Sequence, residues 1–405
     1  MPLFKIPFNS LLSDSTLFLN GKIYKNEYII NKLNQDELMF LNEINEYFRD
    51  ICSGYTCCIV KNGNFYFFKD DLGLKSLGYN NNAVSNYEFE IEANPTFFYK
   101  FNGEKILEIE KRKSVEEEIT DGGDKYSEAK SNDYIFEFEN LFSNSIRKLL
   151  NMTNDKVFIL FSGGIDSFLV AFFTHKILKE GVPIYLINTT FVDGIIKSID
   201  REMGLAGWKD LKQICTGREF ILIENNVLYK ECDNRKEYIN SLVYPKCSLM
   251  DINIGMCLNF GAKKAKELGA KYVFLGSGAD ELFGGYFKYK NCVNLKEELK
   301  KDVMGIWERN LGRDDRVITS EDIESLLPFL DPRLIKLSYK LPANQLVREE
   351  ETVINKYLLR CVLIKNGFHR VAKIKKTAMQ YGSGIFKWEV KNRKLNEIQN
   401  MLSGL

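Results

Sequence analysis

One stretch of the chain, VFILFSGGIDSFLV at residues 157–170, constrains the fold more than any other. It opens with a continuous apolar run at 157–161, which is typical of a strand buried on both faces of a parallel sheet. A polar turn follows at 162–167, and residues 168–178 continue as an apolar helix that ends before Gly181. The stretch therefore predicts a strand, a glycine turn and a helix. Free backbone N–H groups and the positive end of the helix dipole meet at such a turn, where they favour an anion.

Strands and helices alternate along the chain around this stretch, as they do in open parallel sheets. Apolar runs predict further strands at 183–188, 220–224 and 271–275. Helical patterns occupy 134–150, 200–215 and 250–268. We therefore predict an α/β fold, an open parallel sheet with helices on both faces, whose carboxyl edge forms one ligand crevice.

The sequence before this sheet has a different character. Residues 1–107 contain short β-type runs, and the Asn-Gly pair at 62–63 between the runs 55–60 and 64–68 predicts a hairpin. Residues 108–133 are charged and lack apolar periodicity, which is typical of a linker. We therefore predict a smaller β-rich domain at 1–107, a linker at 108–133 and a second domain at 134–405.

The composition favours a cytoplasmic protein with small-molecule substrates or a protein partner. The 56 basic and 55 acidic residues almost cancel, so no global field attracts nucleic acid or an anionic membrane. The sequence shows neither a signal-peptide pattern at its start nor an apolar run long enough to span a membrane. The nine cysteines form no C-x-x-C pair and there are two histidines, which favours reduced thiols over zinc or iron–sulfur ligation.

A second glycine-rich motif gives the first one a functional context. SGGIDS at 162–167 is neither a Walker loop nor a dinucleotide loop, and alone it could be an ordinary turn between a strand and a helix. GSGADELFGGY at 276–286 places Asp280 in a glycine-rich loop at the end of the last predicted strand. Together the two motifs resemble the asparagine synthetase family of ATP pyrophosphatases, which have an adenine nucleotide alpha hydrolase-like fold. The segments 309–318, 324–331 and 375–384 extend the resemblance.

The resemblance implies that Mg-ATP binds at the two loops and that Asp166 and Asp280 share a magnesium ion. Magnesium prefers carboxylate, water and phosphate oxygens, so two separated carboxylates suit it. It also implies two catalytic residues, Lys376 at the phosphates of an adenylating transition state and Glu324 on the substrate side. The residues expected to contact ATP are Leu160, Ser162, Gly163, Gly164, Asp166, Ser167, Ile187, Gly276, Ser277, Asp280, Lys356 and Lys376.

The first domain resembles the Ntn-type glutaminase domain of glutamine-dependent amidotransferases. KDDLGLKSL at 69–77 keeps much of a turn of that domain, and ANPTFF at 93–98 resembles one of its later strands. That glutaminase uses a cysteine directly after the initiator methionine as its nucleophile, whereas this chain has Pro2. The next cysteines, Cys52, Cys57 and Cys58, lie in apolar sequence and are expected to pack. We therefore predict a degenerate glutaminase-like domain and no use of glutamine as nitrogen donor.

Two departures affect the expected reaction, which is adenylation of a carboxylate, aspartate by default, followed by attack of an amine or ammonia. Ser277 stands where the family has a glutamate, and Leu326 stands where it has an arginine. A serine hydroxyl is not a base near neutral pH without an activating partner. ATP binding is therefore expected to outlast asparagine formation. A catalytically silent nucleotide-binding scaffold remains an alternative. An RNA-modifying pyrophosphatase of the same fold is disfavoured by the neutral charge.

Overall fold

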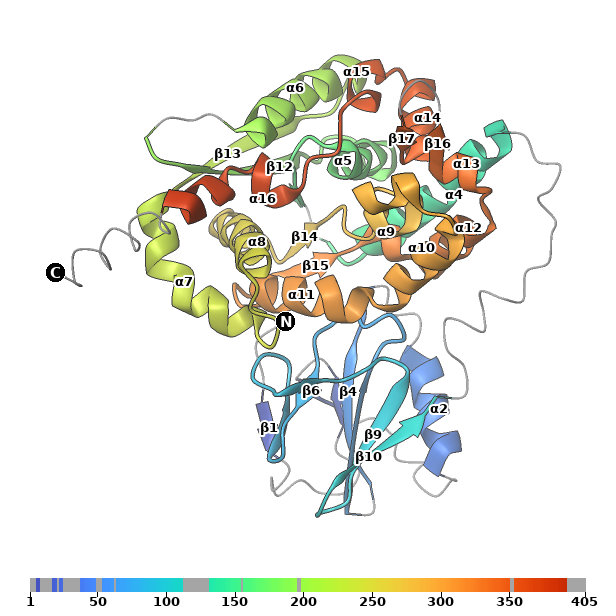
Figure 1. Ribbon diagram of the computed structural model, residues 1–405, viewed down its shortest axis with the longest axis vertical. Coiled ribbons are helices and arrows are strands. Elements are labelled where there is room, and N and C mark those ends of the chain that lie inside the picture. The colour runs from blue at the N-terminus through green and yellow to red at the C-terminus, as the bar shows by residue number, and fades with distance from the viewer. Residues whose placement is uncertain are drawn as a thin grey trace.

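The computed structural model describes residues 5–7, 17–19, 22–24, 37–48, 53–61, 63–111, 131–153, 156–194, 198–349 and 353–391. The chain folds into an N-terminal part up to residue 111 and a C-terminal part from residue 131 (Figure 1). In this view the N-terminal part, in blue, lies below the C-terminal part. Pro2, Cys52 and residues 112–130 of the predicted linker lie outside the described residues.

The C-terminal part is built on five parallel strands in the order β13-β12-β11-β14-β15. β11 is the central strand, so the glycine turn that follows it lies in the middle of the carboxyl edge. The sequence does not predict β15, because a strand of three residues shows no clear alternation. The other four predicted strands are confirmed. The bounds are β11 Val157–Leu160, β12 Ile184–Val192, β13 Phe220–Leu228, β14 Tyr272–Phe274 and β15 Glu324–Leu326.

Helices cover both faces of the sheet, as predicted. Successive side chains of a strand point to opposite faces, and Val157 and Ile159 of β11 join one hydrophobic cluster while Phe158 joins another. The first cluster includes side chains of α4 Ser131–Leu150, α5 Ile165–Ile177 and α6 Ile199–Ile214. The second includes side chains of α7 Tyr229–Val243, α8 Leu249–Glu267 and α11 Gly312–Thr319. Among the helices that the structure describes, none is long and apolar enough to cross a membrane.

The chain after β14 forms short elements that return to the carboxyl edge of the sheet. α14 packs into the same hydrophobic cluster as α5, through the side chains of Leu358, Leu359 and Val362. The elements are α9 Ala279–Phe283, the 3₁₀ helix η1 Phe287–Asn291, α10 Leu295–Met304, the π-helical turn η2 Trp307–Leu311, the 3₁₀ turn η3 Pro328–Leu330, α12 Pro332–Lys340, α13 Ala343–Leu346, the antiparallel pair β16 Val347–Glu349 and β17 Val353–Asn355, α14 Tyr357–Lys365, α15 His369–Ala372 and α16 Met379–Gly382.

The N-terminal part contains two antiparallel sheets and a helix. The predicted hairpin is confirmed, since β4 Thr56–Lys61 pairs with β5 Asn64–Lys69. One face of this hairpin packs against α2 Glu37–Phe48 and the other against the second sheet. The strands of the larger sheet are, in order, β10 Ile106–Glu110, β9 Phe97–Phe101, β5, β4, β2 Leu17–Leu19 and β3 Lys22–Tyr24; those of the smaller are β1 Lys5–Pro7, β7 Ala83–Ser85, β6 Gly78–Tyr79 and β8 Ile91–Glu92.

Three details of this part bear on the sequence predictions. β10 extends to Glu110, so the predicted linker begins inside a strand, and β9 begins only at Phe97 of the segment 93–98. Cys57 and Cys58 are buried on opposite faces of β4, and burial raises the pKa of both thiols. These two cysteines therefore act as small packing residues. The glutaminase-like identity of the N-terminal part remains a prediction.

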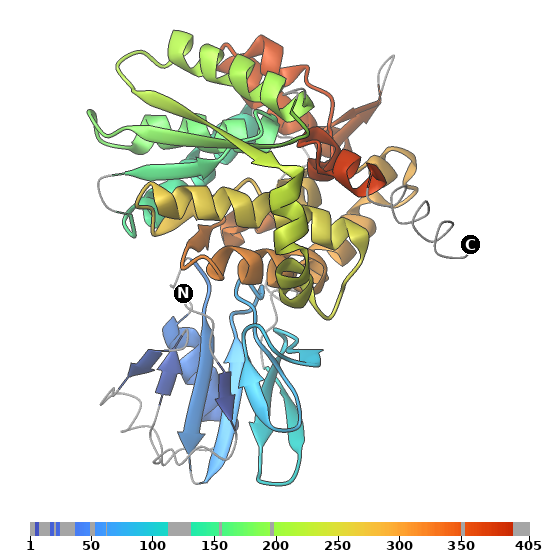
Figure 2. The same cartoon turned by 90° about the vertical axis from the view of Figure 1, so that its left-hand side faces the viewer.

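The two parts meet through a cluster of buried charges, here called the interface ion cluster: Lys69, Lys75, Glu92, Asp315 and Arg316. Glu92 lies between two cations, with Lys69 Nζ 3.3 Å from its Oε1 and Arg316 Nη1 3.6 Å from its Oε2. Asp315 accepts hydrogen bonds from Lys75 Nζ at 3.4 Å and from the backbone N–H of Ser76 at 2.8 Å. Figure 2 shows the two parts from the side, again with the N-terminal part below the C-terminal part.

The start of α11 lies unusually close to this cluster. A Cβ at Gly312 would lie 2.0 Å from Glu92 Oε1, so a larger residue there would have to displace the Glu92 carboxylate. The turn at 69–77 that resembles a glutaminase turn supplies Lys69, Lys75 and Ser76 to the contact. In this chain the motif therefore joins the two parts.

Candidate active site

The glycine turn after β11 leaves the start of α5 open to a ligand. Gly163 has a φ of 81°, in the left-handed region, and a Cβ there would lie 2.4 Å from the carbonyl of Met203. Two serine side chains form hydrogen bonds within the turn. The Gly164 N–H donates to Ser162 Oγ, and Ser167 Oγ donates to the Gly164 carbonyl. The first N–H groups of a helix have no helical partner, so those of α5 can bind phosphate oxygens.

We expect Gly163→Ala to unfold more readily than the wild type. An added Cβ brings left-handed strain of about 1–3 kcal/mol and collides with the backbone of Met203 and Gly204. Gly164→Ala is the matched control, because its φ is −72° and an added Cβ would meet only Ser162 Oγ, at 3.3 Å. Urea unfolding of both variants measures the difference in the free energy of unfolding. If both variants lose the same free energy of unfolding, the strain and the clash expected at residue 163 are absent.

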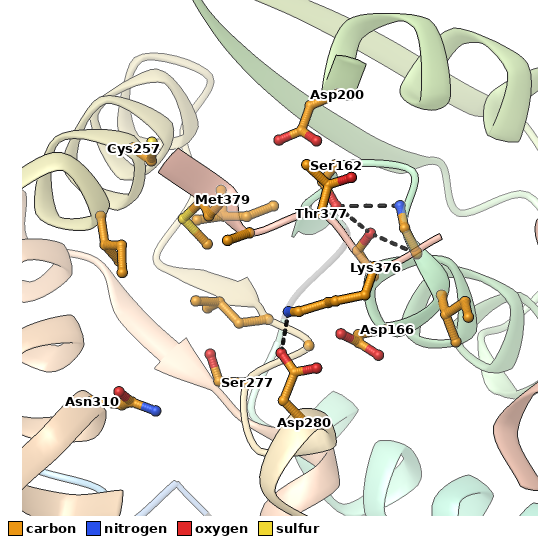
Figure 3. A pocket seen from close by; sticks show the side chains of 18 of the residues that line it. Ser162, Asp166, Asp200, Cys257, Ser277, Asp280, Asn310, Lys376, Thr377 and Met379 are labelled. Atoms are coloured by element: carbon orange, nitrogen blue, oxygen red, sulfur yellow. Dashed lines mark hydrogen bonds and ion pairs between the residues drawn. The ribbon is translucent and has the colours of Figure 1, made fainter. Parts of the chain in front are cut away.

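The second glycine loop lies beside the first because β14 is the sheet neighbour of β11. Gly276 and Ser277 follow β14 and line the same cavity as the first loop. Asp280 lies in the first turn of α9, and Figure 3 shows it near Asp166 and Lys376. The sheet order thus brings together two motifs that are more than a hundred residues apart in the sequence.

Two carboxylates and two lysines form the centre of the site, here called the carboxylate–lysine cluster: Asp166, Asp280, Lys356 and Lys376. Lys356 Nζ lies 2.6 Å from both carboxylate oxygens of Asp166 and 2.7 Å from Asp280 Oδ1. Lys376 donates to Asp280 Oδ2, the bond drawn as a dashed line in Figure 3. The four formal charges cancel.

The lysines control the charge state of Asp280. Burial pushes the pKa of this carboxyl up, but the ammonium groups of Lys356 and Lys376 outweigh burial and hold the pKa below its ordinary value. Burial lowers the pKa of Lys376, and Asp280 and Asp166 then raise it above its ordinary value. Asp280 and Lys376 therefore stay charged at neutral pH.

The two carboxylates fit a magnesium ion. Asp280 Oδ1 is buried, and Lys356 Nζ lies 2.7 Å away as its ion-pair partner, so a metal ion would bind this oxygen in place of the ammonium group. In the part of the chain that the structure describes, no three His, Cys, Asp or Glu side chains gather to hold an ion. An ion held by Asp166 and Asp280 would therefore complete its shell with water and ligand oxygens, which is the usual situation for magnesium.

These groups line a cavity of about 420 Å³ at the carboxyl edge of the sheet. That volume is in the range of small-molecule pockets. Gly163 is not part of the lining, because it packs against Met203 and Gly204. The other expected ATP contacts all line the cavity: Leu160, Ser162, Gly164, Asp166, Ser167, Ile187, Gly276, Ser277, Asp280, Lys356 and Lys376.

The structure does not bring Glu324, predicted to be catalytic, to this cavity. Glu324 opens β15 and is in register with Tyr272, the first residue of β14, so it lies at the amino end of both strands. Its Oε2 lies 4.0 Å from Lys75 Nζ, beside the interface ion cluster. Leu326, at the position where the family has an arginine, is fully buried in the core. Of the two residues that depart from the family pattern, Ser277 and Leu326, only Ser277 lines the cavity.

Two buried carboxyl groups that sequence reasoning did not single out also line the cavity, Asp200 and Glu281. Burial raises the pKa of each to about 7. Tyr286 Oη and Asn310 Nδ2 both donate to Glu281 Oε1, whereas no side chain within the described residues donates to the Asp200 carboxylate. The sequence held a signal for both residues, because Asp200 lies in the first turn of the helix after a predicted strand and Glu281 belongs to the second glycine motif.

Comparison with known proteins confirms the resemblance to the asparagine synthetase family. Residues 137–311 match the family model described as asparagine synthase. An asparagine synthetase domain-containing protein of Drosophila melanogaster is 33% identical over 253 residues, 57% of this chain and 45% of that protein. One of Saccharomyces cerevisiae is 28% identical over 376 residues, 81% of this chain and 69% of that protein. Asparagine synthetase domain-containing protein 1 of Homo sapiens is 29% identical over 321 residues.

The extent of these matches differs among the relatives. The match spans about half the length of the fly and human proteins, 45% and 50%, and about two thirds of the yeast protein. The family model begins within α4 and ends with η2, so it includes both glycine loops but neither Lys356 nor Lys376.

Proposed function

Because residues 137–311 match an asparagine synthase domain, we propose that the chain binds Mg-ATP and adenylates a carboxylate for amide formation. The observation that carries this proposal is the convergence of Asp166 and Asp280, from two strand-end loops, with Lys356 and Lys376 in one cavity. Carboxylates for a metal, ammonium groups for phosphates and an open helix N-terminus together suit a metal–polyphosphate ligand.

Each part of the site has a defined role in this reaction. The N–H groups at the start of α5 would bind phosphate oxygens, and Asp166 and Asp280 would hold magnesium, which neutralises phosphate charge when bound. Lys376 would face the charge that develops on the α-phosphate and the leaving pyrophosphate. The acceptor carboxylate attacks the α-phosphorus to give an acyl-AMP and pyrophosphate, and an amine then attacks the acyl carbon to give an amide and AMP.

Aspartate and ammonia are the substrates that the resemblance favours, with weak turnover. Ser277 lines the cavity and cannot take a proton from the attacking nitrogen as a carboxylate would. This observation also favours a second candidate, a nucleotide-binding scaffold without catalysis that acts through a protein partner. The cytoplasm remains the expected location.

The test combines ATP binding with pyrophosphate release. We expect calorimetry to show ATP binding that requires magnesium, and pyrophosphate release when the correct carboxylate is present in a panel that begins with aspartate. Magnesium-dependent ATP binding without pyrophosphate release for any carboxylate would support the scaffold. No ATP binding at millimolar nucleotide would refute the proposal.

A further inference from the structure

Lys356 takes up the space between the two carboxylates. Its Nζ lies within 2.7 Å of three carboxylate oxygens, two from Asp166 and one from Asp280. The remaining oxygen, Asp280 Oδ2, accepts from Lys376. All four carboxylate oxygens therefore face a lysine ammonium group.

Lys356 is held in this place from both sides. Its side chain is 3% exposed, and its backbone has a φ of 54°, a left-handed conformation that costs free energy outside glycine. The preceding residue is anchored, because Asn355 Nδ2 donates a hydrogen bond to the Gly285 carbonyl at 2.7 Å. The carbonyl of Lys356 itself accepts a hydrogen bond from the Arg360 N–H of α14 at 3.1 Å. The surrounding structure thus fixes the lysine where it meets both carboxylates.

An ammonium group and a divalent cation cannot share this gap. A magnesium ion binds oxygens at about 2.0–2.1 Å, and it would repel an ammonium group held on the same oxygens. A metal ion that binds without a nucleotide would displace the Lys356 ammonium group from the carboxylates. This group would then be buried without a counter-ion, which costs free energy. A triphosphate changes this balance, because its oxygens can accept the displaced ammonium group while its charge brings the metal.

We propose that Lys356 is a built-in counter-ion that excludes free divalent cations and admits the metal only together with a polyphosphate. The proposal rests on the proposed Mg-ATP site and adds how metal and nucleotide depend on each other there. Lys356 acts as a positioning residue: it holds Asp166 and Asp280 in place before the ligand arrives and transfers to phosphate oxygens when the ligand binds.

Manganese(II) binding, followed by electron paramagnetic resonance of the free ion, tests the proposal without any activity. We expect Lys356→Met to bind Mn²⁺ alone at least about tenfold more tightly than the wild type, the lower end of the effect of groups around a metal. The same variant should bind Mn-ATP more weakly than the wild type. Lys365→Met is the matched control, since Lys365 is on α14 and pairs with a carboxylate, Glu139, outside the cavity.

A second variant keeps the test decisive if Lys356→Met does not fold. Lys356→Arg keeps the positive charge and should exclude Mn²⁺ as the wild type does. Tight binding of Mn²⁺ to the nucleotide-free wild type would overturn the proposal, and so would equal Mn²⁺ affinities for folded Lys356→Met and the wild type. If neither protein binds ATP, the proposed function fails, but tighter binding of Mn²⁺ by Lys356→Met would still establish Lys356 as the counter-ion.

Discussion

Glu92→Ala is expected to lower the free energy of unfolding by about 3–5 kcal/mol, the loss found when one partner of a buried ion pair is removed. The side chains of Lys69 and Arg316 are 0% and 2% exposed, and burial holds the pKa of each below its ordinary value. The Glu92 carboxylate opposes this effect of burial on both groups, and the variant removes it. Because Lys69 belongs to the N-terminal part and Arg316 to α11, the loss would weaken the contact between the two parts. Urea unfolding measures the free energy of unfolding.

Glu88→Ala is the control for this result. Glu88 pairs with Lys5 at 2.8 Å, but its side chain is 57% exposed, and exposed pairs contribute about 0–1 kcal/mol. A Glu92→Ala variant no less stable than Glu88→Ala would show that the interface ion cluster does not hold the parts together.

Asp280→Asn is expected to weaken Mg-ATP binding by a factor of about 100 or more, because even groups around a metal ligand change metal affinity 10–100-fold. The variant removes one of the two carboxylates, so that Lys356 keeps its ion pair with Asp166 while Lys376 loses its ion pair with Asp280. Calorimetry with ATP at saturating magnesium measures the affinity.

The pH dependence follows from the depressed pKa of Asp280. A carboxyl group with a lowered pKa in the folded state stabilises the fold above its unfolded pKa, and this stability is lost as the pH falls toward the folded pKa. Asp280→Asn should therefore be less stable than the wild type at pH 7, with the difference shrinking in acid. Asp322→Asn is the exposed comparison: the hydrogen bond from Lys266 also lowers the pKa of Asp322, but this side chain is 66% exposed, so solvent screens the pair and a smaller loss of stability is expected. Its φ of 56° is one that asparagine tolerates. If Asp280→Asn binds Mg-ATP as tightly as the wild type does, Asp280 is not a ligand of the metal ion.

The centre of the fold could be predicted from the sequence because local and long-range signals agree there. The run 157–161 is apolar throughout, so it indicates a buried central strand, and the glycines that follow indicate a turn whose φ of 81° at Gly163 few other residues adopt. The motif spacing also places Asp280 at a strand end, where parallel topology brings it to Asp166.

Features that depend on packing between distant segments could not be predicted. Glu324 lies in a run that resembles a substrate-side segment, but β15 places it at the amino end of the sheet beside Lys75. The roles of Lys69 and Lys75 at the interface depend on α11, which is more than two hundred residues away in the sequence. Lys356 was predicted as an ATP contact, yet its position between two carboxylates follows from the three-dimensional path of β17 and α14.

The position of β14 between β11 and β15 has a consequence for how the chain folds. β11, β12 and β13 follow one another closely and can pair early, but the whole segment from β12 to α8 must be closed into a loop before β14 can reach β11. The two glycine loops meet only after that late step. A nucleotide that binds both loops would therefore have no target on the folding chain until the sheet is nearly complete, and it would act mainly as a brake on unfolding.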